Sequence, residues 1–192
     1  MAKLVVYPET SPGRPSLSTS DPAEIAAHLR GIGVTYEQWT ATETLPADAD
    51  QGAVLRAYAA DVARIQAQGF NTVDVIRLAG DLDDPAFLAK AAEARQKFLA
   101  EHTHDDDEVR FFVEGSGAFY LRVDGSVHVV VGEAGDYLFV PKDTKHWFDM
   151  GSRPRFAAIR FFAIPEGWVG RFTGDAIASG FPSFDDVVAV VR

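Results

Sequence analysis

Hydrophobic and polar residues follow a helical spacing in much of the first hundred positions of this 192-residue chain. The pair Asp21-Pro22 opens one predicted helix, over residues 21–30, and Asp84-Pro85 opens another, over 84–99. Asp is a favoured N-cap and Pro suits the first helical turn. Residues 50–68 predict a longer helix that ends at Gly69, whereas residues 34–39 and 70–78 predict strands.

From residue 101 onward the pattern changes to short strands separated by turn residues. The pair Asp124-Gly125 predicts a hairpin turn, and Gly132 and Gly135 mark the next one. Short strands at this spacing are typical of an antiparallel β-barrel or jelly roll. We therefore expect a mainly β fold with flanking α-helices, in which the N-terminal helices pack outside the barrel.

The chain contains no internal repeat and no linker that would divide it. We expect a single domain over residues 1–192, with a helical and strand part over 1–100 and the β-barrel core over about 101–172. The polar stretch 9–20 is expected to be a surface loop. Gly115 and Gly117 interrupt a predicted strand and indicate a bulge or a close backbone approach.

The composition of the chain excludes some classes of function but does not identify one. The formal net charge of −10 argues against nucleic acid or an anionic membrane as a partner. The N-terminal apolar run is too short for a signal peptide, and no stretch approaches the roughly 20 apolar residues of a membrane span. We expect a soluble cytoplasmic protein, and a monomer.

Four residues have the types and the spacing of a metal site. His102 and His104 alternate on a predicted strand, so both imidazoles point to one face. If residues 105–107 form a turn, Glu108 returns to the same ion on the next strand, and His146 comes from a strand alongside. His28 and His128 lie outside this pattern, and we expect them to be structural or exposed.

The type of metal follows from the ligands. The chain has no Cys, which excludes a thiolate site. Three imidazoles and a carboxylate around a six-coordinate ion leave two positions free, enough for a substrate that binds through two oxygens. A Zn site with four protein ligands tends to be closed and structural, so we favour one Fe(II) or Ni(II) per chain.

The motifs that carry these residues resemble those of the cupins. The pattern His-x-His-x-x-x-Glu-x-x-x-x-x-x-Gly runs from His102 to Gly115, and a second motif runs from Gly135 through Pro141 to His146. This chain departs from the general cupin pattern outside the four ligands. The departures are Gln96 and Asp143, where Gly is usual, and Met150, where Asn is common.

Within the cupins, the chain is most similar to the acireductone dioxygenases. The resemblance rests on the strings Glu101-His-Thr-His104, Asp107-Glu-Val-Arg-Phe-Phe-Val-Glu-Gly115 and His146-Trp-Phe-Asp-Met-Gly151. It implies O2-dependent cleavage of 1,2-dihydroxy-3-keto-5-methylthiopentene in methionine salvage. With Fe(II) the expected products are 4-methylthio-2-oxobutanoate and formate. With Ni(II) they are 3-methylthiopropanoate, formate and carbon monoxide.

Several other residues acquire expected roles from this reaction. Arg110 lies on the same strand face as Glu108 and is expected to bind the anionic substrate, the alternative being an internal salt bridge. The same argument applies with less force to Arg160. An apolar methylthioethyl tail favours aromatic walls, which we expect from Phe98, Phe148 and Trp168, ordinary core packing being the alternative.

Two other functions compete with the dioxygenase. The chain could be a cupin that binds metal without catalysis, or a cupin isomerase that acts on another chelating substrate. Neither function requires Arg110, Phe148 and Trp168 together with the string from His146 to Gly151. These residues therefore favour the dioxygenase.

Overall fold

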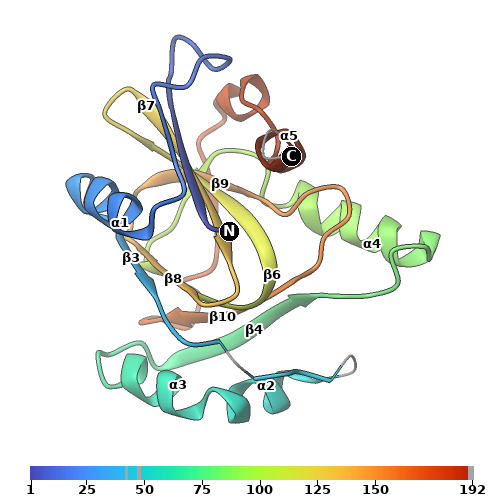
Figure 1. Cartoon of the computed structure of the whole chain (residues 1–192). Helices are drawn as coiled ribbons and strands as arrows, with labels where there is room; N and C mark the ends of the chain where they lie inside the picture. The colour runs from blue at the N-terminus through green and yellow to red at the C-terminus, as the bar shows by residue number, and fades with distance from the viewer. Residues whose placement is uncertain (42, 47–48, 190–192) are drawn as a thin grey trace.

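The computed structural model describes residues 1–41, 43–46 and 49–189 and is shown in Figure 1. The strands are β1 (Lys3–Pro8), β2 (Leu17–Thr19), β3 (Thr35–Gln38), β4 (Thr72–Leu78), β5 (His102–Thr103), β6 (Glu108–Val123), β7 (Ser126–Glu133), β8 (Asp136–Val140), β9 (Lys145–Asp149), β10 (Phe156–Phe162) and β11 (Arg171–Phe172). The helices are α1 (Pro22–Gly31), α2 (Gln51–Ala57), α3 (Ala59–Gln66), α4 (Pro85–Gln96), the 3₁₀ helix η1 (Ile177–Gly180) and α5 (Phe184–Ala189).

Strand β6 organises the β structure because its two halves pair with different strands. The first half pairs with β8 and β10, which extend through β3 and β4 to form sheet I. The second half pairs with β7 and β9, which extend through β1, β2, β5 and β11 to form sheet II. All of these pairs are antiparallel, so the mainly β prediction is confirmed. Among the described residues, however, the strand order runs from β11 to β2 without closing into a complete barrel.

The two halves of β6 meet at Gly115. Its φ is +62°, and the register with β10 shifts between Ala157 and Ala158, which is the irregularity that the glycines suggested. A Cβ at Gly115 would lie 1.7 Å from the carbonyl oxygen of Arg155, so only glycine fits there. This bend allows one strand to serve both sheets.

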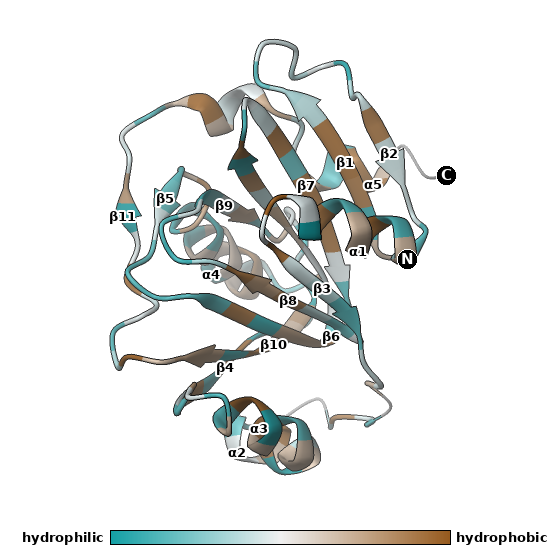
Figure 2. Cartoon of the chain, turned by 90° about the vertical axis from the view of Figure 1, so that its left-hand side faces the viewer, coloured by the Kyte–Doolittle hydropathy of each residue, from teal (hydrophilic) through white to brown (hydrophobic). Residues whose placement is uncertain are grey.

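The space between the sheets is filled by an apolar core to which helix α1 contributes. Asp21 caps α1 as predicted, accepting hydrogen bonds from the backbone N–H groups of Ala23 and Glu24. Ile25 and Leu29 of α1 are fully buried among residues of both sheets. The two-coloured α1 in Figure 2 shows this amphipathic character. Most other residues of α1 are exposed, so α1 lies on the outside of the β structure with one face turned to the core, as expected of the N-terminal helices.

Helices α2 and α3 also pack on the outside, beyond β4 (Figure 1). The single helix predicted over residues 50–68 is instead two helices, because Tyr58 adopts a non-helical backbone between them. Its ring is buried edge-on against Phe111, in a second apolar core on the outer face of sheet I. Burial of an aromatic ring outweighs the modest cost of interrupting a helix.

The outer face of sheet II is covered by the C-terminal segment. Tyr120 and Trp147 stack with ring centroids 5.1 Å apart, and Phe181 and Val187 pack against this face. The sequence patterns did not indicate α5 or β1, and the expected loop over residues 9–20 contains the short strand β2. No helix in the described part of the chain has the length and hydrophobicity needed to cross a membrane.

The buried carboxylate of Asp149 holds two helices against the end of β9. Arg95 of α4 donates to both of its oxygens, over 2.7 and 2.9 Å, and the backbone N–H groups of Gly151 and Phe184 donate as well. Burial opposes the charged form of Asp149. The Arg95 side chain and the two N–H groups outweigh burial, and the pKa of Asp149 is lowered.

The bend in β6 predicts a large difference between two glycine substitutions. Gly115→Ala should lower the free energy of unfolding by about 3 kcal/mol or more, because a left-handed backbone is combined with a steric clash. Gly125 has a similar φ of +72° but open space around its Cα, so Gly125→Ala should cost only about 1 kcal/mol. Urea denaturation followed by circular dichroism measures both values. Equal losses would show that the clash at Gly115 is relieved at no cost.

The Asp149 cluster predicts a pH-dependent contribution to stability. Asp149→Asn should cost about 3 kcal/mol at neutral pH, because Arg95 loses its buried partner. The folded-state pKa of Asp149 lies below the ordinary value of 3.8, so the wild-type advantage is complete above about pH 5 and shrinks as the pH falls through the folded-state pKa. Denaturation curves between pH 2 and 7 test this. Asp83→Asn, which removes an exposed ion pair with Arg153, should show no such trend, and the same trend in both variants would contradict the assignment.

Candidate metal centre

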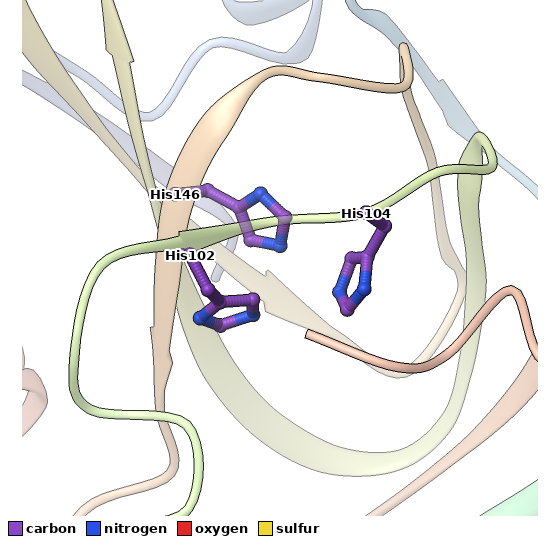
Figure 3. A group of neighbouring side chains, drawn as sticks. All are labelled: His102, His104 and His146. Atoms are coloured by element: carbon purple, nitrogen blue, oxygen red, sulfur yellow. The ribbon is translucent and has the colours of Figure 1, made fainter. Parts of the chain in front are cut away.

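Three histidines meet at one side of the space between the sheets (Figure 3). His102 of β5 lies opposite His146 of β9 in the strand register, and His104 follows β5 by one residue. All three side chains are buried, and one ring nitrogen from each lies within 4.8 Å of the others. The pairing of β5 with β9 is thus the reason that positions 44 residues apart share a site.

Each imidazole is oriented by a hydrogen bond to a backbone carbonyl. The Nδ1 atoms of His102 and His146 lie 2.8 Å from the carbonyl oxygens of Ala100 and Thr144, and Nδ1 of His104 lies 3.0 Å from that of Val169. A carbonyl only accepts, so each Nδ1 carries a proton, and in the neutral ring Nε2 keeps its lone pair. Burial lowers the pKa of His102 to about 4, so its ring is neutral at physiological pH. Burial also opposes the charged form of His104, but its contact with Glu108 outweighs burial and raises the pKa of His104. Metal ligation requires a neutral ring, and the orientation of all three rings leaves Nε2 free for that role.

Glu108 supplies a carboxylate beside these rings. Its Oε2 atom lies 2.7 Å from Nε2 of His146 and 3.4 Å from Nε2 of His104. Burial opposes ionisation of Glu108, but the charge of Arg110, together with the contacts from His104 and His146, outweighs burial and holds the pKa of Glu108 well below its usual range. Despite their proximity, neither Oε2 of Glu108 nor Nε2 of His146 makes a hydrogen bond of normal geometry with any residue that the structure describes. Two buried lone-pair donors that face each other unsatisfied fit a cation bound between them.

Arg110 and Arg160 lie opposite each other on β6 and β10, next to this cluster. Arg110 is buried and contacts Oε1 of Glu108 through Nη2, so the internal ion pair considered for this residue is present. Arg160 pairs with Asp74 of β4 through two contacts of 2.6 and 2.5 Å. Both guanidinium groups nevertheless line the cavity beside the histidines. Their positive charge is therefore available to a bound anion.

A narrow cavity of about 30 Å³, partly open to solvent, extends from these polar groups between the sheets. Phe98 and Phe148, for which a role in binding the substrate tail is predicted, line this cavity. Sequence reasoning missed five further apolar lining residues: Ile76, Phe112, Phe119, Phe156 and Ala158. The alternation of β-strands could have identified two of them, because Phe112 lies two residues beyond Arg110 and Ala158 two residues before Arg160.

The structure does not place Trp168 on the cavity. After β10 the chain turns outward, where Asp106 accepts hydrogen bonds from the backbone N–H groups of Ala163 and Ile164. The following segment lies on the surface, and Trp168 is 49% exposed. This segment contributes to the site through the carbonyl of Val169, which orients His104. The sequence carries no pattern that marks a carbonyl acceptor.

The remaining polar residues singled out in the sequence lie outside the histidine cluster. His28 and His128 form a hydrogen bond 3.0 Å long between α1 and β7, in agreement with a structural role. The turn over residues 105–107 is held by Asp106 and Asp107, each of which accepts hydrogen bonds from backbone N–H groups. Asp143, at a position where cupins usually have Gly, adopts a φ of +62°. The general cupin preference at this position thus has a conformational reason.

Comparisons with known proteins agree with this geometry. A family model described as the ARD/ARD′ family matches residues 4–170. A protein of Parvibaculum lavamentivorans named acireductone dioxygenase is 58% identical over 96% of this chain and 98% of its own length. One of the same name from Parasynechococcus marenigrum is 48% identical over 96% of this chain and 100% of its own.

A solved structure is also similar to this chain. It is described as acireductone dioxygenase from Bacillus anthracis with a cadmium ion in the active centre. The two superpose with a TM-score of 0.74 at 28% sequence identity, over 90% of this chain and 98% of the other. The family match spans β1 to the segment before β11 and includes the three histidines, Glu108 and both cavity arginines. This chain therefore belongs to the ARD/ARD′ family.

Proposed function

We propose that this protein is an acireductone dioxygenase that holds one Fe(II) or Ni(II) ion. The observation that carries the proposal is the set of three buried imidazoles, each oriented by a carbonyl at Nδ1 and each keeping its Nε2 lone pair, with Glu108 beside them. The relatives that bear this name match along nearly the whole chain, which supports the same activity here.

The donor set limits which metal the site would hold. We propose His102, His104, His146 and Glu108 as the four protein ligands, a mixture of nitrogen and oxygen donors that suits Fe(II) and Ni(II). Either ion, when bound, would act as a Lewis acid that polarises two substrate oxygens. The acireductone family resemblance implies that the metal determines the products, with carbon monoxide formed only in the nickel form.

The charges near the site suit an anionic substrate. Arg110 and Arg160 carry two positive charges, and Glu108 and Asp74 carry two negative charges that balance them. Histidines that ligate a metal are neutral, so a bound divalent cation would leave the cluster with two positive charges. A doubly deprotonated enediol has two negative charges, and we propose that Arg110 and Arg160 face its oxygens and stabilise this form.

The apolar part of the cavity suits the rest of the substrate. Phe98, Phe112 and Phe148 line the cavity together with the two arginines. Aromatic rings bind a thioether tail through apolar and sulfur–aromatic contacts. They also exclude water from the reacting end, which strengthens the interactions of the arginines with the substrate. We therefore propose that substrate and O2 react in this cavity.

The proposal is tested by metal content and product analysis. The purified protein should hold about one Fe or Ni per chain, measured by plasma mass spectrometry. After anaerobic addition of acireductone, O2 should be consumed and formate released, with the keto acid in the iron form and carbon monoxide in the nickel form. His146→Ala should lose both metal and turnover, whereas His28→Ala, outside the cluster, should retain both. A protein that binds metal but leaves acireductone unreacted would instead be a non-catalytic cupin.

The role of Arg110 is tested separately from metal binding. Arg110→Gln should keep about one metal per chain, because Gln can still donate a hydrogen bond to Glu108. It should reduce kcat/KM by about 10²- to 10³-fold, since one charged donor to the developing anion is lost. The matched control is Arg77→Gln, because Arg77 pairs with Glu114 on sheet I at similar exposure but does not line the cavity. A similar loss in both variants would indicate a structural role for Arg110.

A further inference from the structure

The cavity changes from polar to apolar along β6 and β10. Arg110 and Arg160 are register partners, and the next inward-facing pair is Phe112 and Ala158. The same order holds along sheet II, where Leu121 lies opposite His146 and Phe119 opposite Phe148. The apolar end of the cavity is therefore the end away from the histidines.

Two glycines lie directly opposite each other at that end. Gly117 of β6 and Gly132 of β7 are register partners, and strand alternation places them on the same inner face as Phe119 and Val130. Neither glycine has a positive φ, so their conformation does not require glycine. Gly115, two residues earlier in β6, does require it.

Glycine is required at these two positions because a neighbouring ring occupies the space that a side chain would fill. A Cβ at Gly117 would lie 2.4 Å from Cζ of Phe148, and a Cβ at Gly132 would lie 2.8 Å from Cε2 of Phe112. Both rings are cavity-lining residues, and each leans against a glycine that has no side chain. A methyl group at either position would project from the sheet into the interior and move the ring toward the cavity.

We propose that the Gly117–Gly132 pair sets the depth of the apolar end of the cavity and thereby the longest substrate tail that the enzyme accepts. The reference to a substrate tail rests on the proposed dioxygenase function. The glycines act through Phe148 and Phe112 and do not themselves contact the substrate. They are specificity-determining residues, because the rings occupy the recess that the glycines leave.

The test uses inert chelators that do not depend on turnover. Straight-chain alkyl hydroxamates present two oxygens to a metal and carry tails of one to six carbons. Calorimetry with Ni(II)-loaded wild-type protein should show an affinity that rises about fourfold per methylene while the tail remains in the cavity, then falls. In Gly117→Ala and Gly132→Ala the optimal tail should be shorter by one or two carbons. The affinity for acetohydroxamate should change less than twofold, because the polar end is untouched.

Three further variants distinguish a change in cavity depth from a general loss of folding or stability. Gly80→Ala would place a Cβ 2.5 Å from Phe87, away from the cavity, and should leave the optimal tail unchanged. Phe148→Leu removes the ring atoms that contact Gly117 and should lengthen the optimal tail. In that background Gly117→Ala should have little further effect, because the atoms that clash are gone. This double variant also tests the proposal if Gly117→Ala alone fails to fold.

The outcomes distinguish this inference from the proposed function. An unchanged optimal tail in both alanine variants would overturn the proposal, as would an equal loss for short and long probes. A shortened optimum with the same preference in turnover of tail-modified acireductones would support it. If wild-type protein leaves acireductone unreacted but the hydroxamate optimum shifts as described, the dioxygenase proposal fails and the role of the glycine pair in cavity depth stands.

Discussion

The bend in β6 at Gly115 is the constraint on which the rest of the site depends. Before the bend, Glu108, Arg110 and Phe112 face the interior from sheet I. After it, Gly117 and Phe119 face the same interior from sheet II. A strand without this irregularity would present its inward-facing residues on one continuous sheet. The bend therefore brings an ion pair, aromatic walls and a glycine recess from one strand around a single cavity.

Much of the site is recoverable from the sequence because strand alternation and residue chemistry agree there. The positions of His102, His104 and Glu108 follow from local spacing, and the hairpin at Asp124-Gly125 follows from turn chemistry. His146 could be expected only from its residue type and the resemblance to known motifs, because its approach depends on the pairing of β5 with β9. Non-local pairing has no signature in a single sequence.

The features that sequence reasoning missed share this physical origin. Tyr58 interrupts a helix because its ring packs against Phe111, a contact between residues 53 positions apart. The Val169 carbonyl orients His104 across a similar separation, and Trp168 lies on the surface because Asp106 turns the chain outward. The strand β1 packs at both faces, so it shows a continuous apolar run and no alternation. Local patterns carry information on local structure, and tertiary contacts decide the remainder.

The same cluster that suits a metal and an anion is unfavourable for folding in their absence. Glu108, Arg110 and three histidines are buried together. Burial of each polar group costs free energy unless a hydrogen-bond or charge partner offsets that cost. Among the described residues, Oε2 of Glu108 and Nε2 of His146 have no hydrogen-bond partner. The three apolar cores supply the stability that tolerates this arrangement. A cation that satisfies both atoms would bind the folded protein more tightly than the unfolded chain, and the difference in binding free energy would add to the free energy of unfolding.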